Sequence, residues 1–292
     1  MKSCVVAIAK YEGDYIREWV EYNLNIGFNH IFIGDNNDDN QENIREILND
    51  YVIKGLVTII DIKDFYITQI DFYKMAFNNL VGRFDWVLFY DIDEFLVLNN
   101  FYYVNDYLSQ KKFDKFDVIK INQKIMSNDG YVIYINKPVL ERFKKEGNNY
   151  VIGNISDNDN KEHIIYMNNT VKSFYKTGAK LLPSVHSTEK YYPNIKYCDN
   201  RGKEIKDKDY WPNWSQVNEK INHDDAYIKH FATKSLEEYV KYKIKRGWSC
   251  FKNEDQQKYV KDNYLNLDVF EKINGKSTLY EKLYDEYLIK FN

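Results

Sequence analysis

The sequence predicts an α/β protein, and three observations support this class. Short apolar runs of strand length alternate with amphipathic segments of helix length over roughly the first 100 residues. The apolar run at 86–90 is continuous and rich in aromatic residues, as expected for a strand buried on both faces. This run ends abruptly in three carboxylates, Asp91, Asp93 and Glu94. Because open α/β sheets bind ligands at the carboxyl ends of their strands, the acidic turn is the first candidate for a functional site.

In the N-terminal part, the apolar runs predict strands at 5–9, 31–33, 56–60 and 86–90. Apolar residues at helical spacing predict intervening helices at 14–24, 44–52 and 70–80, with Asp14 as a helix N-cap. This alternation indicates parallel βαβ units. Three polar loops, each following a strand, are therefore expected at one edge of the sheet: Lys10–Asp14, Asp35–Asp39 and Asp91–Glu94.

The regular alternation ends near Asn100. Further strands are expected at 117–122, 131–135, 170–175 and 226–231. Residues 148–160 are rich in Asn, Asp and Gly and predict a surface excursion. Ser235 and Glu238 have the spacing of a capping box and predict the start of a helix that runs to Arg246. An apolar stripe from Tyr280 to Phe291 predicts a final helix.

Composition excludes several classes of protein. A length of 292 residues allows a sizeable core, and a formal net charge of -3 argues against nucleic-acid binding through bulk electrostatics. Cys4, Cys198 and Cys250 are too widely spaced for a disulfide framework or a zinc site, and they suit a reducing cytoplasm. The N-terminal apolar run is too short for a signal peptide, and no segment reaches the length of a bilayer span. We therefore expect a cytoplasmic protein.

The acidic turn has a chemical interpretation. Carboxylates at the end of a buried strand are costly unless something there requires negative charge. Mg²⁺ and Mn²⁺ favour oxygen ligands and leave room for substrate phosphates. Asp91 and Asp93 are two residues apart, so one can bind the cation while the other holds it through water or reaches a ribose. The alternative is a solvated acidic turn without a ligand.

The order of the motifs along the chain resembles a known family. The N-terminal motifs are Lys10-Tyr11-Glu12, Glu18-Trp19, Asp35-Asn36, Gln69 and Asp91-Ile92-Asp93-Glu94-Phe95. The later ones are Glu141-Arg142-Phe143, Val171-Lys172-Ser173, Val185-His186, the run from His230 to Tyr239, and Arg246-Gly247. Together they resemble bacterial glycosyltransferases of the GT-A fold, in particular glycosyltransferase family 92 and the related family-2-like group. The sequence departs from the family at Tyr11 and at Asn37-Asp38-Asp39, where the base and ribose are expected to bind.

The resemblance implies a Rossmann-like GT-A fold with a mixed central sheet and C-terminal helices. It implies a nucleotide-sugar-binding half at 1–125, an acceptor-side half at 126–234 and a helical segment at 235–292. The implied activity is metal-dependent, inverting transfer of a sugar from a nucleotide diphosphate, with a UDP-sugar expected, to a glycan or lipid-linked glycan. The implied process is biosynthesis of a cell-surface polysaccharide such as capsule or lipopolysaccharide. A lipid-linked acceptor would bring the protein into peripheral contact with the inner face of the membrane.

The resemblance also assigns roles to residues. Asp91 and Asp93 would hold Mn²⁺ or Mg²⁺, with His186 as a third ligand. The expected donor-binding residues are Lys10, Glu12, Asp35, Gln69, Asp91, Lys172, His230 and Arg246. The expected catalytic base, which accepts the proton of the acceptor hydroxyl, is Asp129 or Glu141. Several of these residues also have a plain structural interpretation, because Asp129-Gly130 is a hairpin signal and a lone histidine is commonly structural. The aromatic cluster Trp211–Trp214 could stack on a sugar or belong to the core.

Two other functions compete with this interpretation. A phosphatase of the haloacid dehalogenase type also places two aspartates after a strand, but its nucleophile follows the first strand and a Thr or Val lies two residues beyond the second aspartate. Here the motif follows the fourth predicted strand, and position 95 is Phe. A non-catalytic carbohydrate-binding protein would leave the βαβ half and its three polar loops unexplained. Binding of a nucleotide diphosphate would distinguish it from a transferase.

Overall fold

The computed structural model describes residues 1–38, 41–63, 68–156, 162–205, 217–218, 220–247 and 254–291. The chain divides into two compact units. The first consists of residues 1–123 and 151–229, and the second of residues 124–150 and 230–292. The boundaries expected near 125 and 234 separate donor binding, acceptor binding and a helical segment. This functional division stays a prediction.

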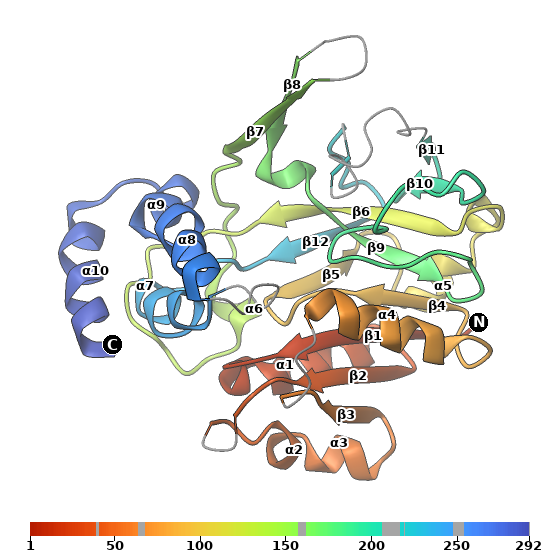
Figure 1. Ribbon diagram of the computed structural model, residues 1–292, viewed down its shortest axis with the longest axis horizontal. Helices are drawn as coiled ribbons and strands as arrows, with labels where there is room; N and C mark the ends of the chain where they lie inside the picture. Colours follow the sequence, from red (N-terminus) through yellow and green to blue (C-terminus); the bar gives the residue numbers. More distant parts are fainter. Residues whose placement is uncertain are drawn as a thin grey trace. The chain divides into compact units, whose positions relative to one another are not determined.

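One mixed sheet forms the centre of the first unit (Figure 1). Strands β3 (Val57–Asp61), β2 (His30–Asp35), β1 (Ser3–Ala9) and β4 (Trp86–Phe89) are parallel neighbours. Strand β9 (Val171–Lys176) is antiparallel to β4 and to β6 (Val118–Ile125). The sheet continues through β10 (Tyr197–Asp199) to β11 (Glu204–Ile205), while β5 (Glu94–Leu98) and β12 (Ala226–His230) pair outside this path. The α/β class and the mixed central sheet expected for a GT-A fold are confirmed.

Helices α1 (Gly13–Asn25) and α4 (Gln69–Leu80) pack against the strands that lead to the acidic turn. Trp19 of α1 is fully buried and donates a 3.0 Å hydrogen bond to the carbonyl of Glu94. Helix α4 begins at a capping box formed by Thr68 and Asp71, which fixes Gln69 as its first residue. The ring of Tyr73 packs on that of Phe89, with their centroids 4.6 Å apart. Both helices therefore hold β4 and β5 by burying aromatic side chains against them.

Two predicted elements differ from the structure. The helix expected at 44–52 is divided at Leu48 into α2 (Ile44–Ile47) and α3 (Asn49–Ile53). The prediction of a strand at 131–135 is wrong. The carbonyls of Tyr131 and Val132 instead accept hydrogen bonds of 3.4 and 3.0 Å from the first N–H groups of α7 (Leu236–Glu238). This segment therefore satisfies a helix terminus and does not join the sheet.

The predicted surface excursion at 148–160 contains a strand. Strand β7 (Val151–Ser156) pairs in antiparallel fashion with β8 (Glu162–Tyr166), and the two form a separate two-stranded sheet. Among the described residues of the first unit there are also three short helical segments, α5 (Val104–Leu108), η1 (Lys111–Phe113) and η2 (Met167–Asn169).

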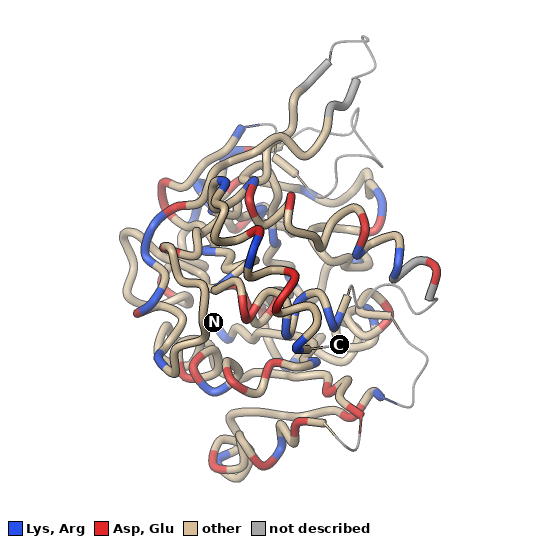
Figure 2. Tube along the Cα trace, turned by 90° about the vertical axis from the view of Figure 1, so that its left-hand side faces the viewer, with Lys and Arg blue, Asp and Glu red and all other residues tan. Residues whose placement is uncertain are grey.

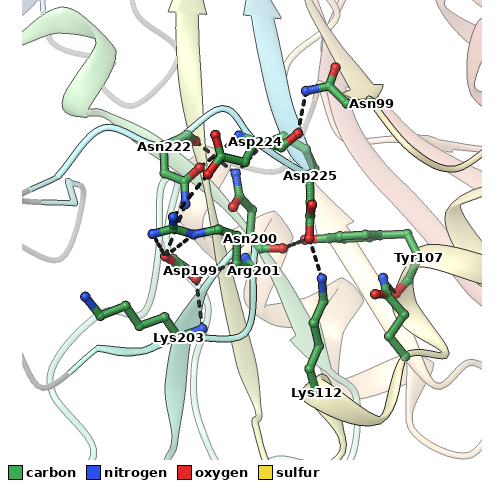
Figure 3. Close-up of polar contacts among 12 residues, drawn as sticks. Asn99, Tyr107, Lys112, Asp199, Asn200, Arg201, Lys203, Asn222, Asp224 and Asp225 are labelled. Atoms are coloured by element: carbon green, nitrogen blue, oxygen red, sulfur yellow. Dashed lines mark hydrogen bonds and ion pairs between the residues drawn. The ribbon is translucent and has the colours of Figure 1, made fainter.

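A polar network ties the loop after β10 to the segment that leads into β12 (Figure 3). The carboxylate of Asp199 accepts hydrogen bonds from the backbone N–H groups of Arg201 and Lys203, at 3.0 and 2.9 Å. The buried amide of Asn200 donates to the carbonyls of Asn222 and Ala226, at 2.9 and 2.5 Å. These bonds replace the backbone pairing that regular secondary structure would provide.

The second unit is mainly helical. The helices that the structure describes in it are α6 (Val139–Arg142), α7, η4 (Tyr239–Ile244, a π-helix), α8 (Glu254–Tyr264), α9 (Leu267–Asn274) and α10 (Thr278–Phe291). The predicted capping box is present, because Ser235 and Glu238 satisfy each other's backbone N–H groups. The core of this unit is formed by Leu236, Tyr239, Val240, Phe270, Tyr280 and Tyr287.

Acidic and basic residues are interspersed over the trace, in keeping with the small net charge of the chain (Figure 2). Within the part of the chain that the structure describes, no helix combines the length and apolarity required to cross a membrane.

Candidate active site at the acidic turn

The strand registers place three polar loops at the same edge of the sheet. Ala9 at the end of β1 pairs with Asp35 at the end of β2, and Val6 pairs with Phe89 at the end of β4. Because these strands are parallel, the loops that follow them leave the sheet in the same direction. This arrangement agrees with the expectation from the sequence, although Asp39 lies outside the described residues.

The acidic turn is closed by its own first and last residues. The N–H of Glu94 donates to the carbonyl of Asp91 at 3.1 Å, and the Glu94 carboxylate accepts from the N–H of Asp91 at 2.8 Å. Asp93 and Glu94 are buried, whereas the side chain of Asp91 is 35% exposed. The turn therefore joins β4 directly to β5 and leaves the Asp91 carboxylate accessible to solvent and ligands.

A buried lysine pairs with this turn. Nζ of Lys172, on the neighbouring strand β9, lies 2.8 Å from Oδ2 of Asp91 and 3.6 Å from Oε2 of Glu94. The Lys172 side chain is only 1% exposed. The cost of burying this ammonium is offset because it faces two carboxylates.

Amide side chains hold both carboxylates from either side. Nε2 of Gln69 donates to Oδ1 of Asp91 and to the hydroxyl of Tyr73, each at 2.8 Å. Nε2 of Gln123, on β6, donates to Oε1 of Glu94. Oε1 of Gln123 in turn accepts a 2.5 Å hydrogen bond from the hydroxyl of Thr170. Four separate elements thus contribute to one continuous hydrogen-bonded network.

Burial and charge act in opposite directions on the ionisable groups. Burial raises the pKa of Glu94 to about 8, with Lys172 opposing this and the nearby charges of Asp91 and Asp93 adding to it. Burial also opposes ionisation of Asp91, but the Lys172 ammonium holds the pKa of this carboxyl below its usual value. The pKa of Lys172 is raised, because its two carboxylate neighbours outweigh the effect of burial. The ion pair between Lys172 and Asp91 therefore persists at neutral pH.

Of the three predicted metal ligands, Asp91 and Asp93 lie in the acidic turn and His186 approaches the neighbouring strand. Nδ1 of His186 lies 3.0 Å from the carbonyl of Val171. Donation from Nδ1 selects the tautomer in which Nε2 carries the lone pair, as in many metal-binding histidines. Among the described residues, no three His, Cys, Asp or Glu side chains are gathered to hold a metal ion.

The acidic turn nevertheless fits one class of cation site. Mg²⁺ usually keeps several waters and is bound through one or two carboxylates together with substrate phosphates, without a cage made only of protein ligands. Asp91 has a solvent-accessible carboxylate, and Asp93 lies two residues away in the same turn. The donor set therefore suits a divalent cation that arrives with a phosphorylated substrate.

The other two loops are joined by Asn37. Oδ1 of Asp35 accepts hydrogen bonds from the backbone N–H and the amide of Asn37, at 3.0 and 2.9 Å. Oδ1 of Asn37 in turn accepts from the N–H of Tyr11 at 2.9 Å. Lys10 forms an ion pair with Asp38 at 3.7 Å, and Glu12 is buried at the start of α1. Asp35 thus shapes its own turn, and this turn supports the loop after β1.

Two residues of this region were missed in the sequence. Oε2 of Glu42 accepts a 2.7 Å hydrogen bond from the N–H of Gly13, and burial, with the charges of Glu12 and Asp14, raises the pKa of Glu42. Gln123 was also missed; it is buried on β6, one residue beyond the strand expected at 117–122. No local signal identified Gln123, because it lies among the polar residues Asn122 and Lys124 of the same strand. Glu42 lies in a uniformly polar segment and gave no signal either.

Four further predicted residues belong to the second unit: Asp129, Glu141, His230 and Arg246. The Asp129 carboxylate accepts hydrogen bonds from the hydroxyl of Ser127 at 2.7 Å and from the N–H groups of Lys144 and Lys145 at 2.9 and 3.0 Å. Glu141 is exposed on α6. The other members are His230, at the end of β12, and Arg246, which follows η4. The Trp211–Trp214 cluster lies outside the described residues.

Comparisons with known proteins bear on the identity of the chain. The sequence model of glycosyltransferase family 92 matches residues 2–269. A search of curated proteins finds no match. Among solved structures, the chain is similar to S. aureus TarS in complex with UDP, with a TM-score of 0.37 and 14% identity over 61% of this chain and 47% of that chain. For the complex of TarS with UDP-GlcNAc, the TM-score is 0.37 and the identity 14%, over 61% of this chain and 46% of that chain. A further S. aureus TarS structure has a TM-score of 0.41 and 13% identity over 93% of this chain and 43% of that chain. The chain thus spans about half the length of the first of these structures, at 47%.

Proposed function

Because the chain belongs to glycosyltransferase family 92, we propose that this glycosyltransferase takes its sugar from a nucleoside diphosphate, with UDP as the expected nucleotide. The proposed acceptor is a glycan or a lipid-linked glycan, and the proposed process is synthesis of a cell-surface polysaccharide. The observation that carries the donor proposal is the acidic turn after β4. There, the accessible carboxylate of Asp91 lies at the edge of the sheet from which two further polar loops leave.

We further propose that Asp91 and Asp93 hold Mn²⁺ or Mg²⁺ against the diphosphate, with His186 as an additional ligand. When bound, the cation supplies Lewis-acid stabilisation of the negative charge that develops on the leaving phosphate. The protein's own contribution is orientation, because the hydrogen-bonded network around Asp91 fixes the position of its carboxylate before the donor arrives. Lys10, Glu12 and Asp35 are the proposed contacts to the nucleoside.

An inverting transfer requires a base that accepts the proton of the acceptor hydroxyl. Glu141 and Asp129 remain the proposed candidates. Glu141 is exposed, whereas the carboxylate of Asp129 already accepts three hydrogen bonds, one from Ser127 and two from the backbone N–H groups of Lys144 and Lys145. This difference favours Glu141, since a base must be free to accept a proton from the incoming acceptor hydroxyl.

A thermal-shift experiment tests the donor and metal together. UDP, GDP and CMP are added with and without Mn²⁺ to the wild type, to Asp93→Asn and to the control Asp85→Asn. Asp85 is an exposed aspartate that immediately precedes β4, whereas the acidic turn follows β4. A ligand at about 100 times its dissociation constant stabilises by roughly 2.7 kcal/mol, which corresponds to a few degrees for a chain of this size.

We expect a Mn²⁺-dependent shift with UDP in the wild type and in Asp85→Asn, and its loss in Asp93→Asn. A shift of equal size without Mn²⁺ would contradict the metal site but not the donor. A shift with GDP or CMP in place of UDP would change the donor class. The absence of any nucleotide shift would overturn the proposal of a nucleotide donor.

A further inference from the structure

We propose that Lys172 is a positioning residue that holds the Asp91 carboxylate in place for the donor, and that it does not itself bind the diphosphate. This inference rests on the proposed function, because it assigns a role within the same site. It replaces the general expectation that a lysine near the diphosphate neutralises phosphate charge.

The first argument is the accessibility of the ammonium. A side chain that binds a phosphate must present its charge to the substrate, but the Lys172 side chain is 1% exposed. The Asp91 side chain, which pairs with this ammonium, is 35% exposed. At 2.8 Å, the contact from Nζ to Oδ2 of Asp91 is a charge-assisted hydrogen bond. The geometry therefore places the carboxylate, and not the ammonium, where a ligand can reach it.

The second argument is that the carboxylate is fixed at both oxygens from different elements. Lys172 donates to Oδ2 from β9, while Gln69 donates to Oδ1 from the first turn of α4. Two donors on separate elements define the position and the plane of the carboxylate. Precise placement of this kind is required of a group that orients a substrate or its cation.

The third argument concerns the other end of the turn. Glu94 lies 3.6 Å from the same ammonium, and its carboxylate accepts the N–H of Asp91. Gln123 holds the remaining oxygen of Glu94. Lys172 thus contacts the first and the last carboxylate of a four-residue turn. Its removal would leave both carboxylates without their cation and release the turn that connects β4 to β5.

A double-mutant cycle tests this role. The dissociation constant for UDP in the presence of Mn²⁺ is measured by calorimetry for the wild type, Lys172→Met, Asp91→Asn and the double variant. We expect Lys172→Met to weaken binding by roughly tenfold or more, because the Asp91 carboxylate loses one of the two donors that fix its position. In the Asp91→Asn background, the same substitution should change binding by less than about twofold, the limit of ordinary additivity.

Two further variants complete the design. Lys176→Met removes a lysine four residues along the same strand and serves as the matched control, which should bind UDP like the wild type. Lys172→Met combined with Glu94→Gln replaces the ammonium together with the buried acidic group 3.6 Å from it, so it protects against simple failure to fold. This Lys172–Glu94 variant should melt closer to the wild type than Lys172→Met does and still bind UDP weakly, because Asp91 has lost the donor to its Oδ2.

Equal losses in the wild-type and Asp91→Asn backgrounds would overturn the proposal, because they indicate a direct contact between Lys172 and the nucleotide. Unchanged UDP binding in Lys172→Met or in the Lys172–Glu94 variant would also overturn it. If the wild type binds no nucleotide, the proposal of a nucleotide donor fails. Urea unfolding of the four proteins of the cycle without ligand (wild type, Lys172→Met, Asp91→Asn and the double variant) then still tests the positioning role of Lys172. Non-additive effects on unfolding support a Lys172 that acts through Asp91, and additive effects contradict it.

Discussion

Nε2 of Gln69 lies 2.8 Å from Oδ1 of Asp91, although the two residues are 22 positions apart in the sequence. The capping box of Thr68 and Asp71 starts α4 at Gln69 and so directs this amide toward the acidic turn. The same nitrogen also donates to the hydroxyl of Tyr73. The start of one helix thus sets the position of a carboxylate at the end of a neighbouring strand.

The first prediction follows from this contact. Gln69→Leu should weaken binding of UDP with Mn²⁺ by about 1.5–3 kcal/mol, the range for a hydrogen bond to a charged group. Tyr73→Phe removes the other acceptor of the same amide and should leave affinity within about 0.5 kcal/mol of the wild type. Calorimetry on both variants measures the difference. An equal loss in both would show that the packing of α4, and not the bond to Asp91, determines affinity.

The second prediction concerns the second unit. The guanidinium of Arg142 forms two hydrogen bonds with Glu238, at 2.6 and 2.9 Å, and both side chains are 2% exposed. Arg142→Met should lower the free energy of unfolding by about 3–5 kcal/mol, because it leaves a buried carboxylate without its partner. Arg142→Met with Glu238→Gln should recover part of that loss. Urea unfolding of the single and double variants tests both statements, and an equally unstable double variant would contradict the ion-pair explanation.

The same pair predicts sensitivity to acid. Burial disfavours the charged form of Glu238, but Arg142 and Ser235 hold the pKa of this carboxyl below its ordinary value of 4.5. A carboxyl with a lowered pKa in the folded state contributes stability that is complete above the ordinary value and is lost as the pH falls through the folded value. The free energy of unfolding of Glu238→Gln should therefore depend less on pH below 4.5 than that of the wild type. Parallel curves for the two proteins would exclude this linkage.

The sequence predicted the parts of the fold that local pattern determines. Strand β4 was identified because burial on both faces makes its residues uniformly apolar. Strand β5 was missed because it begins at Glu94, which appears in the sequence as part of an acidic cluster. The strand expected at 131–135 was wrong because its carbonyls pair with α7, more than 100 residues later. Only the folded chain shows this contact.

In the candidate site, too, local sequence pattern predicted some features, while others depend on contacts that form only in the folded chain. The acidic turn and its position at the sheet edge were predictable, because parallel βαβ units place successive loops on one side. The partners of the turn were not, because Lys172 and Gln123 come from strands that pair far along the chain. Lys172 was expected near the donor, but its burial beside Asp91 depends on the antiparallel pairing of β4 and β9. Pairing across a mixed sheet leaves no local periodicity that could reveal such a contact.

The third prediction uses two asparagines that make similar bonds in different surroundings (Figure 3). The amide of Asn200 is buried and donates to two carbonyls, and the amide of Asn99 is exposed and donates to the carbonyls of His223 and Asp224, at 2.7 and 2.6 Å. Asn200→Ala should cost about 1–3 kcal/mol of unfolding free energy, because the freed carbonyls lose their donor away from water. Asn99→Ala should cost under about 1 kcal/mol, since water replaces its amide. Similar losses would show that burial does not govern this network.

The fourth prediction is the pH dependence set by Glu94. Its pKa rises from an ordinary value of 4.5 to about 8, chiefly through burial. For a group whose folded pKa is raised, stability is complete below the ordinary value and falls as the pH rises toward the folded value, at up to about 1.4 kcal/mol per pH unit. Urea unfolding between pH 5 and pH 9 should therefore show a decline in the wild type that Glu94→Gln reduces. The exposed Glu286→Gln is the control and should decline like the wild type. If Glu94→Gln and Glu286→Gln decline equally, Glu94 is ionised at no net cost, and Lys172 then compensates its burial in full.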